Sequence, residues 1–212
     1  MLNINNNKDL IKFGRIEAML LDKNVYLIKE QVQFMKLSGR YDIFDPLTNL
    51  QIGFAKEEPG KLIHFLRFIV SKAMLPNKVN VYDTENDSIA FIIKKPFTLL
   101  RSKVTIYDGA ENYIGYFKGK ILTIGGGFWV FDSTEHEIAE IKGDWKGWNF
   151  DFLKQGNSIG TVTKKWAGIG KELFTSADNY VISLNEDEYT KDAIILLLAA
   201  GLAIDIVYKE NK

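Results

Sequence analysis

Hydrophobic and polar residues alternate along much of this chain, and the alternation recurs in five similar units. Each unit has an aromatic or β-branched strand, a few polar residues, and a return strand that opens with isoleucine followed by glycine or alanine. A period of two is typical of strands with one buried face. The sequence therefore predicts five consecutive β-hairpins, which begin at Tyr41, Val79, Val104, Phe128 and Trp148.

In the first four units the outgoing strand ends in aspartate. An aspartate carboxylate accepts backbone N–H bonds in turns, and the small residue of the return strand leaves room for close approach of another backbone. Because these aspartates occupy equivalent hairpin corners, a structural role explains them without acid–base chemistry. They are Asp45, Asp83, Asp108 and Asp132.

Three further stretches alternate in the same way, at residues 25–29, 32–37 and 180–184. The total is about a dozen antiparallel strands, which predicts a mainly β fold closed as a barrel or folded as a sandwich. We expect a single domain over residues 1–212, with residues 1–20 as an N-terminal extension.

The strongest apolar run extends from Ala193 to Ile204, between Asp192 and Asp205, and predicts a helix over residues 191–208. Twelve helical residues span about 18 Å, whereas the hydrocarbon core of a bilayer is about 30 Å thick. Membrane insertion and burial in protein are both open, and the length favours a buried core helix.

A second helix is predicted over residues 61–75, where large apolar residues recur at helical spacing between Pro59 and Pro76. One interpretation is a lid that packs on the end of the barrel. The other is a helix that lies on a membrane surface, because cationic residues accompany its apolar ones, at Lys61, His64, Arg67 and Lys72.

The amino-acid composition argues against several classes of function. Lysine plus arginine and aspartate plus glutamate both total 27, so the net charge is zero, which argues against a nucleic-acid partner. Cysteine is absent, and so are disulfides, thiol catalysis and palmitoylation. The N-terminus shows no signal peptide and Leu2 excludes myristoylation, so we expect a cytoplasmic location. The two histidines fit no metal motif, and nothing indicates an enzyme.

Clusters of basic residues at strand ends are the remaining candidates for a binding site. If one rim of the barrel gathers them, they would bind anionic lipid headgroups. The alternative is that they are ordinary exposed-strand lysines that prevent aggregation. They are Lys94, Lys95, Arg101, Lys103, Lys118, Lys120, Lys164 and Lys165.

Three stretches carry a resemblance to a known family: residues 26–45, residues 164–184 and the terminal apolar helix with its following residues, 205–210. The chain resembles the phospholipid scramblase and LURP-one-related family, whose fold is that of the tubby C-terminal domain. The resemblance implies a closed antiparallel barrel of twelve strands around a central hydrophobic C-terminal helix. On that helix it singles out Ala193, Leu197, Gly201, Ile204 and Asp205.

The resemblance also implies a calcium segment, which is incomplete here. Asp178, Asn179 and Asp187 match it, while a serine replaces its first aspartate and Tyr189 its last. Calcium needs six to eight oxygen ligands, and residues 180–184 read as a strand, which does not curl around an ion. We expect no cofactor, with calcium as the one candidate.

The function implied by the resemblance is phospholipid binding at the cytoplasmic membrane surface, with transbilayer lipid scrambling as its extreme form. The length of the apolar helix and Asp205 within it argue against scrambling. The alternative is a soluble protein-interaction or housekeeping barrel without lipid activity, which fits the zero net charge. The expected partners are therefore anionic phospholipids or other proteins.

Overall fold

The computed structural model describes residues 20–31, 39–58, 75–84, 87–97, 103–120, 127–144, 148–164, 179–185 and 189–209, with the backbone alone for 205–209. Within these residues the chain forms a short 3-10 helix, twelve strands and a C-terminal helix. They are η1 (Leu20–Asp22), β1 (Val25–Glu30), β2 (Arg40–Phe44), β3 (Gln51–Glu57), β4 (Asn77–Asp83), β5 (Ile89–Lys95), β6 (Lys103–Asp108), β7 (Tyr113–Gly119), β8 (Gly127–Asp132), β9 (Glu137–Asp144), β10 (Asn149–Lys154), β11 (Asn157–Thr163), β12 (Asn179–Leu184) and α2 (Lys191–Lys209).

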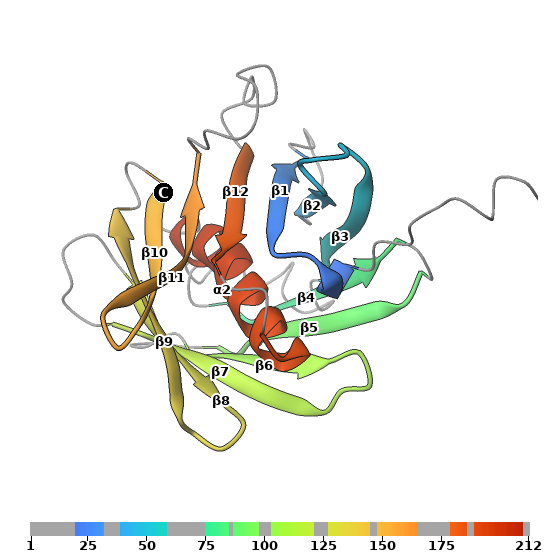
Figure 1. Ribbon diagram of the computed structural model, residues 1–212. Coiled ribbons are helices and arrows are strands. Elements are labelled where there is room, and N and C mark those ends of the chain that lie inside the picture. Colours follow the sequence, from blue (N-terminus) through green and yellow to red (C-terminus); the bar gives the residue numbers. More distant parts are fainter. Residues whose placement is uncertain are drawn as a thin grey trace, which may run out of the picture.

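The strands form a closed antiparallel barrel in which each strand pairs with its neighbour in sequence and β1 closes the ring against β12. Figure 1 shows the barrel encircling α2. The predicted fold class is therefore confirmed, and closure settles the choice between barrel and sandwich. The strand predicted at residues 32–37 and residues 61–74 of the predicted second helix lie outside the described residues.

The five predicted hairpins are present, and each has a register shift close to its turn. Such a bulge places two residues opposite one, bends the strand and increases its twist. Five bulges near the same rim therefore curve the sheet toward closure. In four hairpins the extra residue is the isoleucine of the repeated pattern: Ile52, Ile114, Ile138 and Ile159.

The hairpin turns gather at one end of the barrel, which we call the aspartate rim. There Asp45 accepts a bond from the backbone N–H of Leu47 at 2.9 Å. Asp108 and Asp132 each accept two backbone N–H bonds within their own turns. Asp83 differs, because it accepts the N–H of Leu20 in η1 at 2.9 Å. The structural role predicted for these aspartates is confirmed for the first three turns named here.

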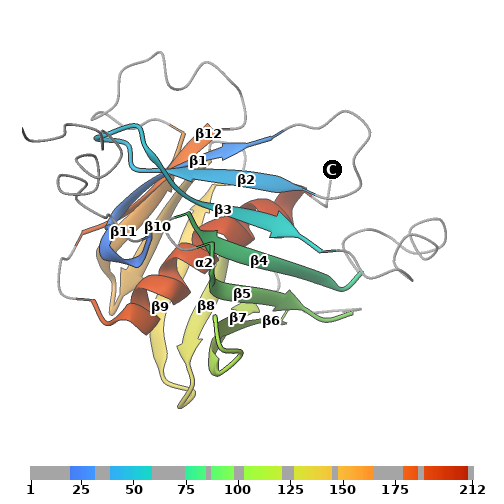
Figure 2. The ribbon, with the colours of Figure 1, turned by 90° about the vertical axis from the view of Figure 1, so that its right-hand side faces the viewer.

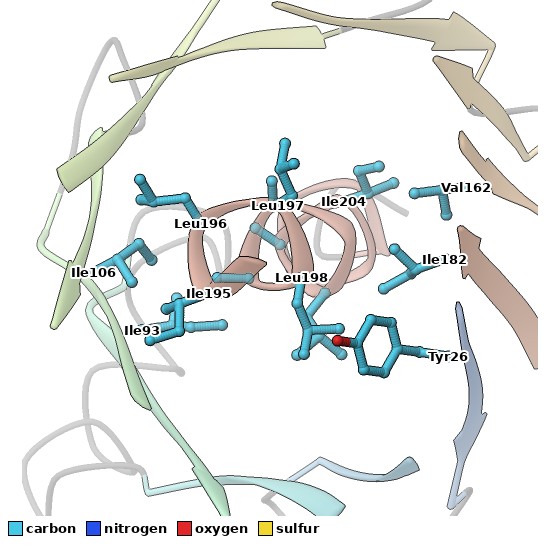
Figure 3. Packing of buried hydrophobic residues seen from close by; sticks show 14 of the residues in the cluster. Tyr26, Ile93, Ile106, Val162, Ile182, Ile195, Leu196, Leu197, Leu198 and Ile204 are labelled. Carbon is cyan, nitrogen blue, oxygen red and sulfur yellow. The ribbon is translucent and has the colours of Figure 1, made fainter. Parts of the chain in front are cut away.

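Helix α2 crosses the barrel from the aspartate rim (Figure 2). The hydroxyl of Thr190 accepts the backbone N–H of Ala193 at 3.2 Å and caps its first turn. The helix is apolar on all sides because strands surround it on all sides. Inward-pointing side chains such as Ile106 and Ile182 meet it (Figure 3), and Leu197 and Ile204 are 1% and 0% exposed.

At Gly201 the helix packs closely against the wall. A Cβ atom there would lie 2.4 Å from Cδ1 of Ile182 on β12. No side chain fits into that space without displacing the wall, so glycine is required for this approach. Among the described residues, no helix is both long and apolar enough to cross a bilayer.

Candidate functional site

The antiparallel order brings the described candidate lysines to one end of the barrel, opposite the turns, which we call the lysine rim. Arg101 and Lys165 lie outside the described residues. The shared rim does not give the side chains a shared role, because their amines end in different places. The six described lysines are Lys94 and Lys95 at the end of β5, Lys103 at the start of β6, Lys118 and Lys120 at the end of β7, and Lys164 after β11.

Lys94 and Lys95 contribute little positive charge to the surface of the lysine rim. The amine of Lys94 reaches Glu111 in the β6–β7 turn at 3.1 Å, passing over the ring of Tyr107. Its side chain therefore points toward the aspartate rim. Lys95 is 4% exposed. Sequence reasoning grouped both with the other lysines, although the alternation of Phe91 and Ile93 continues to Lys95 and places it on the inward face.

Lys120 is part of the wall. Its side chain is buried, pairs with Glu140 on β9 and lies over the ring of Trp129 at 4.8 Å. Glu140 also pairs with Lys142 at 3.1 Å. Burial opposes ionisation of Glu140, but the bonds from the two lysines outweigh it and hold its pKa below the usual value. The charge of Lys120 is thus compensated within the protein.

Lys164 lies apart from the others, since four strands separate β11 from β6 on the shorter way around the barrel. Its amine sits 4.5 Å from the ring centre of Trp148, which packs against Tyr180 at 5.3 Å. This contact places a cation on an aromatic face near the rim.

Lys103 and Lys118 are the described candidates that remain open to a ligand, and we call them the lysine pair. They are direct cross-strand partners on β6 and β7. Lys103 is exposed and Lys118 half-buried, and in the described part of the chain neither is paired with a carboxylate. Like charges directly opposite each other destabilise a sheet, so an anion between them would relieve a repulsion.

Aromatic rings accompany the lysine pair on the outer wall. The amine of Lys103 lies 4.1 Å from the ring centre of Tyr116, and Tyr116 stacks on Phe131 at 4.7 Å. Trp129 is the cross-strand partner of Lys118. Sequence reasoning missed Tyr116 as a site residue, although the alternation of β7 already placed it on the face opposite to Phe117.

The candidate calcium segment is described only in part. Asn179 begins β12, is 7% exposed and pairs in register with Lys29 of β1. Asp178 and Asp187 lie outside the described residues, so the calcium hypothesis stays a prediction. Among the described residues, no three histidine, aspartate or glutamate side chains are grouped closely enough to hold a metal ion.

A hollow of about 380 Å³ lies at the aspartate rim, between η1, the end of β12 and the start of α2. Leu184, Tyr189 and Ile194 form apolar parts of its lining. Of its charged residues, Lys23 is paired with Asp45 at 2.8 Å. The hollow therefore lies at the rim opposite to the lysine pair and shares no strand end with it.

The fold and site define a class: a closed barrel of twelve strands that encloses its own apolar helix and carries a cationic, aromatic outer wall. A model of the Scramblase family matches residues 18–211, and the chain belongs to the Scramblase family. The resemblance noted from the sequence is confirmed.

One relative is the Altered inheritance rate of mitochondria protein 25 of Saccharomyces cerevisiae. It is similar over 251 aligned residues with 23% identity, which covers 96% of this chain and 76% of the yeast protein. No solved structure matches the chain.

Proposed function

We propose that this scramblase-family barrel is a peripheral phospholipid-binding protein that docks on anionic membranes through its lysine pair. The observation that carries the proposal is the position of Lys103 and Lys118, directly opposite each other with no carboxylate partner among the described residues. Membership of the Scramblase family supports it. The predicted membrane association at the cytoplasmic surface is part of the same proposal.

A lipid phosphate fits this position for two physical reasons. An anion between the two ammonium groups relieves their repulsion, and each lysine near an anionic surface contributes about 1 kcal/mol of binding free energy. Tyr116 and Trp129 beside the pair are residue types that are enriched where headgroups meet water. The outer wall of β6–β8 therefore combines the charge and the amphipathic rings that a headgroup layer favours.

We do not propose scrambling by insertion of α2. Insertion of the helix would leave an empty barrel, and wall residues that now pack against the helix would meet water. Each such side chain contributes about 1.5–3 kcal/mol when fully buried, so five of them approach the whole stability of a typical domain. Five wall residues that are 0% exposed are Ile106, Val130, Phe152, Val162 and Ile182.

A protein-interaction barrel is the second candidate, and one observation favours it. Leu47 and Leu50, in the β2–β3 turn of the aspartate rim, are 82% and 58% exposed. Two large apolar side chains on one turn present a small apolar surface to a protein partner. This candidate requires no lipid.

Flotation of the purified protein with liposomes distinguishes the two candidates. Vesicles of phosphatidylcholine alone are compared with vesicles that also contain phosphatidylserine, each at low and high salt. We expect flotation with anionic vesicles at low salt and its loss at high salt, because surface charges are screened. Absence of flotation in every condition would contradict lipid binding and leave the protein-interaction candidate. Flotation that resists salt and alkaline washing would instead contradict a helix that stays in the barrel.

A further inference from the structure

Phe97 is an exposed aromatic residue at the lysine rim. Its side chain is 49% exposed, two residues after the end of β5 at Lys95. In the β5–β6 ladder Lys94 lies opposite Thr105. Lys95 is the last residue of β5 and Lys103 the first of β6, so both strands have these ends at the lysine rim. Phe97 follows the end of β5 and therefore lies at the same rim as the lysine pair.

The other exposed large apolar residues of the described chain lie at the opposite rim. Leu47 and Leu50 occupy the β2–β3 turn, and Tyr113 begins β7 after the β6–β7 turn. Their rim is acidic, with exposed carboxylates such as Asp87 and Glu135 in its turns. An anionic membrane repels such a rim. Among the exposed large apolar residues of the described chain, Phe97 is thus the one at the lysine rim, where Lys103 and Lys118 have no carboxylate partner among the described residues.

We propose that Phe97 inserts into the boundary between headgroups and acyl chains, so that the barrel docks with its lysine rim toward the membrane. This inference rests on the proposed function and adds an orientation and an anchor to it. Cations bind the anionic headgroups, and an adjacent aromatic ring enters the apolar layer. Interfacial membrane anchors combine these two interactions. The aspartate rim then faces away from the bilayer.

The chain contains no cysteine, so one introduced cysteine gives a unique label. Phe97→Cys and the matched control Leu47→Cys are each labelled with an environment-sensitive nitrobenzoxadiazole fluorophore. Each is mixed with vesicles of phosphatidylcholine and phosphatidylserine. We expect a blue shift and an intensity increase for the label at position 97, quenching by a shallow nitroxide lipid, and little change for the label at position 47.

Unlabelled variants test the same anchor without a dye. Phe97→Ala should weaken vesicle binding roughly three- to tenfold, since about half of the ring surface is available for burial. Phe97→Trp should retain binding, and neither variant should change the thermal midpoint, because the side chain is half-exposed.

Parallel flotation separates failure of this inference from failure of the proposed function. If the protein floats with vesicles, but the label at position 97 shows no fluorescence change and Phe97→Ala binds as well as the parent, insertion of Phe97 is overturned. Docking by the lysine pair then remains. A response at position 47 instead of 97 would overturn the orientation. Loss of flotation by every protein, including the unmodified chain, would overturn both.

Discussion

The two rims of the barrel are built from opposite ends of the same strands, but their charged side chains have different partners. At the aspartate rim, carboxylates turn back onto the protein: Asp108 and Asp132 accept N–H bonds of their own turns, and Asp45 is 3% exposed and pairs with Lys23. At the lysine rim, Lys103 and Lys118 face outward beside aromatic rings.

The difference shows why a net charge of zero is a poor guide to binding here. Charges that cancel in the total are separated in space, and those of the aspartate turns are already used to hold the hairpins. Acidic residues at one rim and uncompensated lysines at the other orient the molecule in the field of an anionic surface. The rims should accordingly respond differently to substitution: one in stability, the other in binding.

The largest expected effect concerns the helix that lies between the rims. Gly201→Leu should destabilise the protein by about 3 kcal/mol, because overpacking forces the wall or the helix to move where a Cβ would lie 2.4 Å from Ile182. Chemical denaturation measures it, and the added substitution Ile182→Ala should recover part of the loss. An unchanged denaturation midpoint for Gly201→Leu would mean that the helix does not pack against β12. The helix would then not hold the two rims in the arrangement described here.

At the aspartate rim, Asp45→Ala should lower the free energy of unfolding by about 2 kcal/mol. The substitution leaves the N–H of Leu47 and the amine of Lys23 without their acceptor. Asp151→Ala on the exposed face of β10 is the matched control and should stay within about 0.5 kcal/mol of the parent. Equal losses of unfolding free energy for the two substitutions in urea titrations would contradict a structural role for Asp45 at this rim.

Part of the pH dependence of stability should come from the carboxyls of the aspartate turns. Side-chain bonds from Asn112 to Asp108 and from Thr134 to Asp132, with backbone N–H bonds, lower the pKa of each carboxyl. A lowered folded-state pKa contributes stability that is fully present above the unfolded value, near 4, and lost as the pH falls through the folded value. The loss should be about 1 kcal/mol for the two together, because both are largely solvated.

Denaturant titrations between pH 7 and pH 2.5 measure this dependence. The variant Asp108→Asn with Asp132→Asn should show a flatter profile below pH 4 than the parent chain. If the double variant loses stability with falling pH as steeply as the parent chain, the acid sensitivity comes from other carboxyl groups.

The smallest effect on stability is expected at the lysine rim. Replacement of Lys103 and Lys118 by serine should change the free energy of unfolding by less than about 0.5 kcal/mol, and removal of the cross-strand repulsion favours a slight gain. Thermal unfolding at low and high salt measures it. A loss of several kcal/mol would show that the pair is structural, like Lys120 with Glu140.

The hairpins were predictable from sequence, because alternation and the repeated aspartate report local backbone structure. Burial of α2 was predictable as well, since a run of twelve apolar residues is too short for a bilayer and too apolar for a surface. The contacts that the lysine amines make were not predictable. Whether Lys94 reaches Glu111 depends on the direction of its side chain across two strands, which neighbouring sequence does not encode. Trp129 comes from β8 and could not be assigned to the lysine pair without the register, whereas Tyr116 lies two residues before Lys118 on β7 and shares its face by alternation alone.

The most direct test is the affinity of charge-reversal variants for vesicles of phosphatidylcholine and phosphatidylserine at low salt. Lys103→Glu with Lys118→Glu is compared with Lys154→Glu with Lys191→Glu, which makes the same charge change on exposed lysines of the aspartate rim. At about 1 kcal/mol per lysine, the first pair should lose at least tenfold in affinity, whereas the second should stay within about twofold of the parent. Equal losses, or no loss in either, would contradict docking by the lysine pair.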